Sequence, residues 1–150
     1  MTSRIKSEEE LRKLSVELRF LEQTADALQS RIGMVNAAIT DLTYASMTLE
    51  GIEKEKENSE LLLPVGGNSY IKARLETPDK IIVGMGAGVS MEKTLAEAKT
   101  ILKGRLDSLQ KTRLSLEQQF AQVAEKINED RNLLNSLLAE IRQGKPSKNV

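Results

Sequence analysis

A glycine-rich stretch at residues 81–93, IIVGMGAGVSMEK, comes closest in this chain to a pattern that could bind a ligand. An apolar run that leads into a glycine loop and then a helix is how many nucleotide-binding domains hold a phosphate. A dinucleotide-binding fingerprint needs a glycine where Val89 stands, and no Gly-Lys-Ser/Thr ending completes a P-loop. We therefore expect these glycines to permit positive φ angles in a hairpin turn, and we expect no cofactor.

The chain has no histidine and no cysteine, the residue types that many catalytic and metal sites use. Their absence excludes a histidine-dependent catalytic triad, a thiolate nucleophile, a disulfide and a zinc site of the usual ligands. General acid-base catalysis near neutral pH would then need a carboxylate or a lysine with a displaced pKa. No pair of carboxylates stands out for that work, so we expect no catalytic residue, no metal and no enzymatic activity.

Composition places the 150 residues in one domain with little material for a globular core, because only 39% are hydrophobic and 3% aromatic. The charges balance, with 22 Lys and Arg against 22 Asp and Glu, so no net field attracts nucleic acid or an anionic membrane. No run approaches the ~18 apolar residues of a membrane span. We expect a soluble cytoplasmic protein with no nucleic acid or membrane partner.

Two long heptad patterns account for most of the apolar residues. In the first, apolar side chains recur at alternating steps of three and four from Leu11 to Leu42, and again at Leu49. Ser7 and Glu10 match a capping box before this pattern, and the polar, turn-prone segment KEKENSE follows it. The pattern predicts one helix at residues 8–57.

The second heptad pattern runs from Leu102 to Ile141 and matches the first in length. Arg113 and Asp130 fill two of its core positions, and the sequence alone names no partner for either charge. The pattern predicts a helix at residues 92–142, followed by a flexible tail at 143–150. Each helix carries one apolar stripe that must be buried, and the other helix is its natural partner.

Between the helices, at residues 61–91, the apolar period shortens to that of a β-strand. In SYIKARL and KIIVGM every second residue is apolar, and LLLPV and AGVSM supply two shorter strand candidates. Turn-forming residues stand at 66–68, 77–79 and 84–88. The pattern predicts four strands in two β-hairpins.

The order helix, two hairpins, helix makes the chain double back, so the helices should form an antiparallel coiled coil with both termini at the end far from the hairpins. Four short strands cannot cover their own edges and apolar face, and such a sheet is marginal alone. We infer an α+β fold in which the hairpins of several subunits close into an intersubunit β-barrel. The residues expected at that interface, here called the hairpin set, are Leu61, Leu63, Val65, Ile71, Ala73, Leu75, Ile81, Val83, Met85 and Val89.

The two heptad helices with the hairpins between them resemble the prefoldin family, and specifically its alpha-type subunits. LLLPVGGNSYIKARL looks like the family's first hairpin, with the family's pattern at Pro64, Gly66, Ser69 and Ile71. KIIVGMGAGVSMEKTLAEA looks like the second hairpin, whose glycine turn enters the C-terminal helix. Beta-type subunits carry one hairpin, so two hairpins indicate the alpha class. The resemblance covers nearly the whole chain, as a single prefoldin-like domain at 1–150.

The resemblance implies an ATP-independent co-chaperone, a hexamer of two alpha-type and four beta-type subunits joined by a double β-barrel from which six coiled coils project. In the family, the tips of the coiled coils hold unfolded polypeptides and deliver them to a group II chaperonin. Carried over by position, the residues that would contact the client, here called the tip set, are Ile5, Leu11, Leu14, Leu18, Leu134, Leu137, Leu138 and Ile141.

Three alternatives stay open on the sequence alone. Leucines at heptad spacing are also ordinary packing residues, which would leave the tip set without a direct role. The chain could be a coiled-coil scaffold whose ends bind one defined folded partner. It could also be an alpha-like prefoldin that assembles with itself into filaments instead of joining beta-type subunits.

Overall fold

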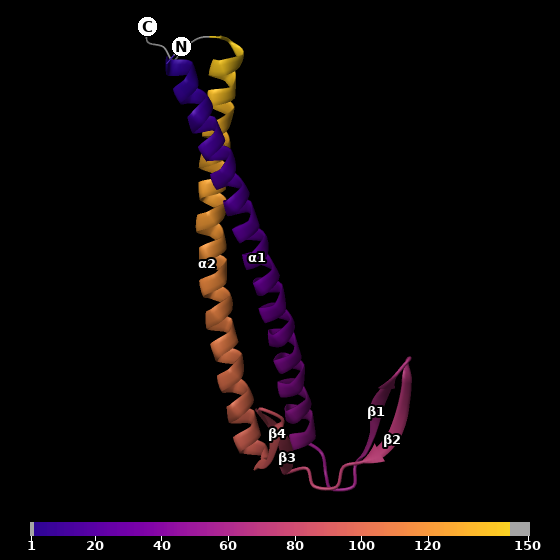
Figure 1. Ribbon diagram of the computed structural model, residues 1–150. Coiled ribbons are helices and arrows are strands. Elements are labelled where there is room, and N and C mark those ends of the chain that lie inside the picture. Colours follow the sequence, from indigo (N-terminus) through magenta and orange to yellow (C-terminus); the bar gives the residue numbers. More distant parts are fainter. Residues whose placement is uncertain (1, 145–150) are drawn as a thin grey trace. The chain divides into compact units, whose positions relative to one another are not determined.

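The computed structural model describes residues 2–144, which form two long helices and two β-hairpins (Figure 1). In chain order the elements are α1 (Thr2–Glu53), β1 (Glu60–Gly66), β2 (Ser69–Arg74), β3 (Lys80–Gly86), β4 (Val89–Thr94) and α2 (Leu95–Arg142). Both hairpins are antiparallel, so the predicted α+β architecture is confirmed. The chain divides into two compact units, one of Met1–Asn36 with Thr112–Val150 and one of Ala37–Lys111. Within residues 2–144, neither helix contains a window apolar enough to cross a membrane.

The first unit is a pair of helix segments that pack along the two heptad patterns. Its buried apolar side chains come from both helices and are Leu14, Leu18, Leu28, Leu116, Ile127 and Leu137. Every other heptad position of this unit, from Leu11 to Val35 and from Arg113 to Ile141, is buried or half-buried. Arg131 of α2 also donates to Glu22 of α1, with 2.9 Å between Nη2 and Oε1. The heptad spacing therefore identified the buried stripe of each helix.

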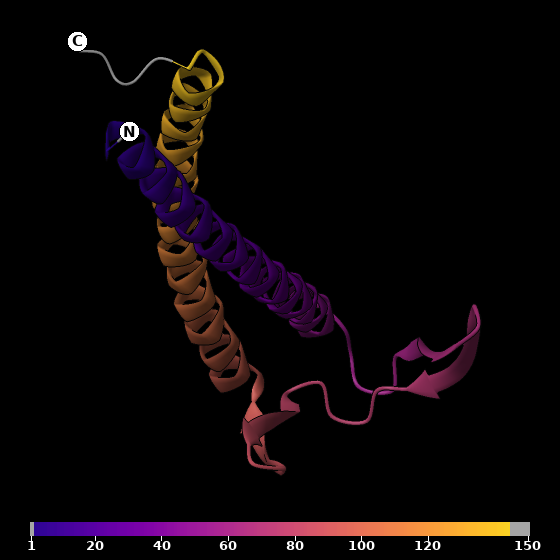
Figure 2. The same ribbon diagram turned by 45° about the horizontal axis from the view of Figure 1, so that its top comes forward.

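The second unit has a small apolar core where the second hairpin meets both helices. Its buried side chains are Leu49 of α1, Val83 of β3 and Ala98 of α2, and the partly buried side chains packed on them are Ile81, Leu95, Ile101 and Leu102. Lys99 of α2 donates to Glu53 of α1, with 2.7 Å between Nζ and Oε2, and this hydrogen bond raises the pKa of Lys99. β4 ends at Thr94 and α2 begins at the next residue, Leu95, so the second hairpin and this helix are consecutive in the chain (Figure 2). The second hairpin is therefore anchored by both covalent continuity and packing.

Leu49→Ala is expected to lower the free energy of unfolding by about 2–4 kcal/mol, because it leaves a cavity in a core made of few side chains. Leu49 is 6% exposed, whereas Met47 on the same helix is 60% exposed, so Met47→Ala is the matched control. Urea denaturation followed by circular dichroism measures both variants. Equal losses in the two variants would contradict the packing described here.

The boundaries of α1 differ from the sequence-based expectation. The helix begins at Thr2 rather than at residue 8, and the Ser7 hydroxyl donates to the Ser3 carbonyl oxygen 3.0 Å away, from within the helix. The capping box predicted at Ser7 and Glu10 is therefore wrong. The helix ends at Glu53 rather than at residue 57. Shortly after it, Asn58 adopts a φ of 67°, which a right-handed helix cannot contain.

A helix cap stands instead at the start of α2. Thr94 Oγ1 accepts a hydrogen bond from the Glu97 N–H and donates one to Glu97 Oε1, both at 3.1 Å. The helix begins at Leu95 rather than at residue 92, because β4 extends to Thr94. The pattern T-x-x-E at residues 94–97 carries this signal, and sequence analysis overlooked it.

Each hairpin turns through two residues with a left-handed backbone. The φ angles are 57° at Gly67 and 58° at Asn68 in the first hairpin, and 52° at Ala87 and 75° at Gly88 in the second. Positive φ at both central residues gives a turn whose twist matches that of the flanking strands. Glycine or asparagine fills three of these four positions at little steric cost.

Candidate functional site

The glycine-rich stretch that could have held a phosphate forms the turn of the second hairpin. β3 ends at Gly86 and β4 begins at Val89, so a strand follows the turn instead of a helix N-terminus. Phosphate sites of this kind rely on the free N–H groups and the dipole of a helix N-terminus. Gly86 has a φ of 99°, a conformation that favours glycine. The stretch has the geometry of a turn.

We expect neither ATP nor NAD to bind to this turn. Isothermal titration calorimetry of the full chain with each nucleotide is the measurement, and the expected result is no heat of binding up to millimolar concentration. A micromolar dissociation constant for either nucleotide would show that the turn had been misread.

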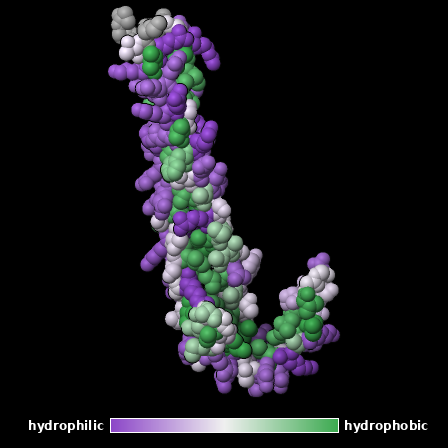
Figure 3. Space-filling view, in the orientation of Figure 1, coloured by the Kyte–Doolittle hydropathy of each residue, from purple (hydrophilic) through white to green (hydrophobic). Residues whose placement is uncertain are grey.

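The first hairpin carries an apolar face that residues 2–144 leave largely uncovered. Leu61 pairs with Ala73 and Leu63 pairs with Ile71 across the two strands, so these four side chains share one face. Leu63 is 48% exposed and Ile71 is 56% exposed. The space-filling view shows apolar surface along this hairpin (Figure 3). An isolated two-stranded sheet is marginal in water, so an uncovered apolar face of this kind favours association.

The hairpin set divides into exposed and internally packed residues. Val83 is 5% exposed and fills the core of the second unit, with Ile81 half-buried against it, so neither offers a free contact. Leu61, Ala73 and Leu75 are half-buried. The exposed members are Leu63, Val65, Ile71, Met85 and Val89.

Sequence reasoning missed four other exposed apolar residues of the hairpins. They are Leu62 at 60%, Tyr70 at 60%, Ile82 at 76% and Met91 at 47% exposed. The signal was present, because the runs LLL at 61–63 and IIV at 81–83 place apolar side chains on both faces of a strand. Both faces of each hairpin thus carry exposed apolar surface.

Most of the tip set is packed between the helices of the first unit. Leu14, Leu18 and Leu137 are 7%, 6% and 8% exposed. Leu11, Leu134 and Ile141 are half-buried. The exposed members are Ile5 at 56% and Leu138 at 37%.

Other apolar side chains of the first unit are more exposed than most of the tip set. Val16 and Phe20 lie one turn apart on α1 and are 65% and 66% exposed, and Leu133 on α2 is 53% exposed. All three fall outside the heptad positions, which is the sequence signal that could have identified them. The exposed apolar surface of this unit therefore lies mainly beside the packed stripe.

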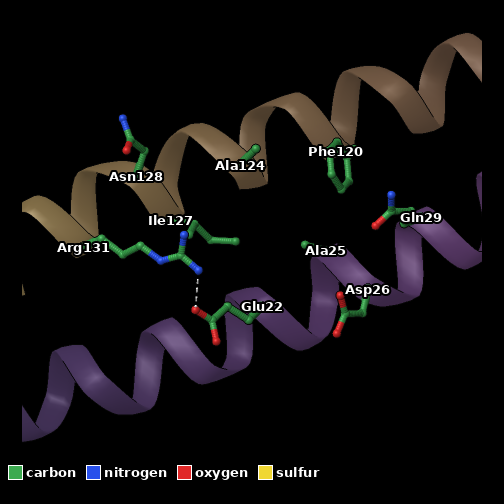
Figure 4. Close-up of a pocket in the computed structure, with 9 residues that line it drawn as sticks. All are labelled: Glu22, Ala25, Asp26, Gln29, Phe120, Ala124, Ile127, Asn128 and Arg131. Atoms are coloured by element: carbon green, nitrogen blue, oxygen red, sulfur yellow. Dashed lines mark hydrogen bonds and ion pairs between the residues drawn. The ribbon is translucent and has the colours of Figure 1, made fainter.

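A shallow hollow opens between α1 and α2 in the first unit (Figure 4). Ala25 and Ala124 leave room at its centre, and the Arg131–Glu22 ion pair spans the two helices beside them. The full lining is Glu22, Ala25, Asp26, Gln29, Phe120, Ala124, Ile127, Asn128 and Arg131. In residues 2–144, no three carboxylates are grouped closely enough to hold a metal ion. The hollow is a gap between small side chains with a mixed polar and apolar rim.

The two charges in the second heptad pattern now have partners. Arg113 Nε lies 3.8 Å from Glu117 Oε1, one turn along α2. Asp130 is buried, and its Oδ1 accepts from Lys126 Nζ at 3.2 Å. That hydrogen bond is the main cause that raises the pKa of Lys126, followed by the negative charges of Asp130 and of Glu17 on α1. Both pairs are formed within α2, at the spacing of one helical turn.

Three comparisons place the chain among known proteins. The family described as Prefoldin, prefoldin subunit, matches residues 21–140. A prefoldin subunit alpha of Methanococcoides burtonii is 34% identical over 121 residues, which is 81% of this chain and 88% of the relative.

Two solved structures share the fold. A filamentous PFD from Methanocaldococcus jannaschii has a TM-score of 0.65 at 28% identity, over 75% of this chain and 93% of that one. The prefoldin beta subunit from Thermococcus strain KS-1 has a TM-score of 0.57 at 17% identity, over 85% of this chain and 90% of that one. The similarity to the beta subunit concerns the fold alone.

Proposed function

Because the chain belongs to the prefoldin family, we propose that it is an alpha-type subunit of an ATP-independent co-chaperone that holds unfolded polypeptides. Membership supports a chaperone-type role, since the family is one of chaperones and not of enzymes. The proposed site of action is the cytoplasm. In this proposal the chain takes part in holding and transfer, and the folding reaction belongs to a group II chaperonin.

The observation that best supports assembly is the uncovered apolar face of the first hairpin. Leu63 and Ile71 form a cross-strand pair and are 48% and 56% exposed. Burying such a face removes apolar area from water, and pairing with strands of other subunits satisfies the hairpin's free edges. We propose that both hairpins join those of other subunits in a β-barrel, in a hexamer of two alpha-type and four beta-type chains. The solved beta-subunit relative has the same fold, which fits such a partner.

The proposed holding surface is the first unit, whose helices carry the tip set together with Val16, Phe20 and Leu133. A client without a fixed shape needs apolar contacts that are weak one by one and repeated on several coiled coils. Exposed apolar side chains beside the packed stripe supply such contacts directly. The buried leucines of the tip set supply further apolar contacts where α1 and α2 separate.

Suppression of aggregation tests the proposed function. A chemically denatured test protein is diluted into buffer without nucleotide, and light scattering is followed with the chain alone, with a beta-type prefoldin subunit alone, and with both. The expected result is the strongest suppression with both chains, with no effect of added ATP. If the assembled complex leaves scattering unchanged, the chain is a scaffold and the proposal fails. Suppression by the chain alone, with particles of indefinite length, would favour a self-assembling filament instead.

Delivery to a chaperonin is the second part of the proposal. A client held by the complex should pass to a group II chaperonin and regain its activity when ATP is added for the chaperonin. If the client is transferred equally well in the absence of this chain, then the chain has no part in delivery.

A further inference from the structure

Asp130 is the one buried charged side chain found in residues 2–144, at 2% exposed. It occupies a core position of the second heptad pattern, between Ile127 and Leu134, where a coiled coil normally places an apolar residue. A carboxylate buried at such a position loses its hydration, and the protein must replace it with hydrogen bonds.

Within the described residues, only one of the two carboxylate oxygens of Asp130 receives a hydrogen bond that replaces its hydration. Oδ1 accepts from Lys126 Nζ at 3.2 Å, while Oδ2 is buried and receives no hydrogen bond from the described part of the protein. Lys126 itself is 50% exposed, so water competes for its charge. Replacing a buried charge of this kind by a well-packed apolar residue is often stabilising, because a half-satisfied polar group is worse than none.

The packed state around Asp130 also hides the leucines that the proposed function needs. Leu14, Leu18 and Leu137 lie in the same unit and are at most 8% exposed. A polypeptide can reach them only when α1 and α2 separate locally. Local opening of this kind occurs most readily where buried apolar contacts are interrupted.

We propose that Asp130 is a built-in weak point of the coiled coil, which lets the two helices part around it and expose the buried leucines of the tip set to an unfolded polypeptide. The nature of the ligand rests on the proposed function, whereas the opening rests on the geometry of Asp130 alone. Asp130→Leu would complete the apolar packing between α1 and α2 and keep the tip set buried.

Hydrogen exchange measured by mass spectrometry on the full chain tests the opening. In Asp130→Leu, amides of residues 11–21 and 127–141 should exchange at least about tenfold more slowly than in the wild type, the equivalent of about 1.4 kcal/mol. In Lys126→Met, which removes the donor to Oδ1, the same amides should exchange faster. Asp107→Leu is the matched control, because Asp107 is exposed on the same helix. Unchanged exchange in Asp130→Leu, or equal slowing in Asp107→Leu, overturns the proposal.

The aggregation assay tests the use of the opening. Asp130→Leu should need up to about tenfold more complex for the same suppression, because the binding-competent open form is correspondingly rarer. Slower exchange with unchanged suppression overturns the proposal, since the opening would then have no part in holding. If the wild-type complex itself fails to suppress aggregation, the proposed function is rejected. The hydrogen-exchange rates then decide by themselves whether Asp130 weakens the packing between α1 and α2.

Discussion

Ile71→Lys is expected to dissociate the oligomer while leaving both helices folded. Ile71 lies on the uncovered apolar face of the first hairpin, opposite Leu63. If this face is buried between subunits, a lysine there must give up its hydration without a partner, which is far costlier than the loss of one apolar contact. The dissociation constant should rise at least about a hundredfold, since ~3 kcal/mol is enough for that. Analytical ultracentrifugation gives the mass, and circular dichroism should show unchanged helix content.

Tyr70→Lys is the matched control for this prediction. Tyr70 neighbours Ile71 in β2 and is exposed to a similar degree, 60% against 56%, but it points to the face that also carries Lys72 and Arg74. We expect Tyr70→Lys to raise the dissociation constant less than Ile71→Lys does, because its face already carries charged side chains. Val83→Lys is unsuitable for this purpose, because Val83 packs inside its own chain and its loss would destabilise the second unit directly. An assembly that survives Ile71→Lys would contradict the barrel.

Removal of residues 1–10 and 138–150 is expected to weaken the holding activity without loss of assembly, because it deletes Ile5, Leu138 and Ile141 of the tip set. The deleted segments belong to the first unit or lie outside the described residues, and that unit contains no strand. The amount of complex needed for half-maximal suppression should rise about tenfold or more, because several coiled coils acting together supply avidity that each contact lacks. Light scattering with a denatured test protein is the measurement, after the mass of the truncated complex has been verified.

A smaller effect is compatible with the proposal only where beta-type chains supply most of the contacts, so the truncation should also be compared in a homo-oligomer if one forms. Full protection by the truncated chain in both assemblies would show that these ends do not hold the client. Val16 and Phe20 remain in the truncated protein, so Phe20→Ser in the full chain separates their contribution from that of the deleted ends.

The fold could be predicted from the sequence because its two periodicities are strong and separate. Heptad spacing from Leu11 to Leu49 and from Leu102 to Ile141 identified both long helices, and alternation in residues 61–91 identified the hairpins. The ends were less predictable. Ser7 matched a cap by type and spacing, yet its hydroxyl bonds back to Ser3 within a helix that continues to Thr2. Local patterns of this kind cannot tell a cap from a serine inside a longer helix.

The candidate site could be predicted only in part, because a pattern shows that a residue is apolar but not what covers it. Ile71 and Val83 looked alike in the sequence, since each occupies an alternate position of a strand. In the structure Ile71 is exposed and Val83 is buried against Leu49 and Ala98, residues far away in the chain. Heptad spacing likewise identified Leu14 and Leu18 as residues packed between the two helices. It could not show that Asp130 would be buried with one carboxylate oxygen unpaired.

Assembly through the hairpins is the claim on which the rest depends, and the mass of the complex in solution tests it most directly. Native mass spectrometry of the chain mixed with a beta-type prefoldin subunit should give one species that contains two copies of this 16.6 kDa chain and four of the partner. The chain without its partner should not give that species. A 16.6 kDa monomer that persists in both samples, with its hairpins unpaired, would contradict the proposed assembly.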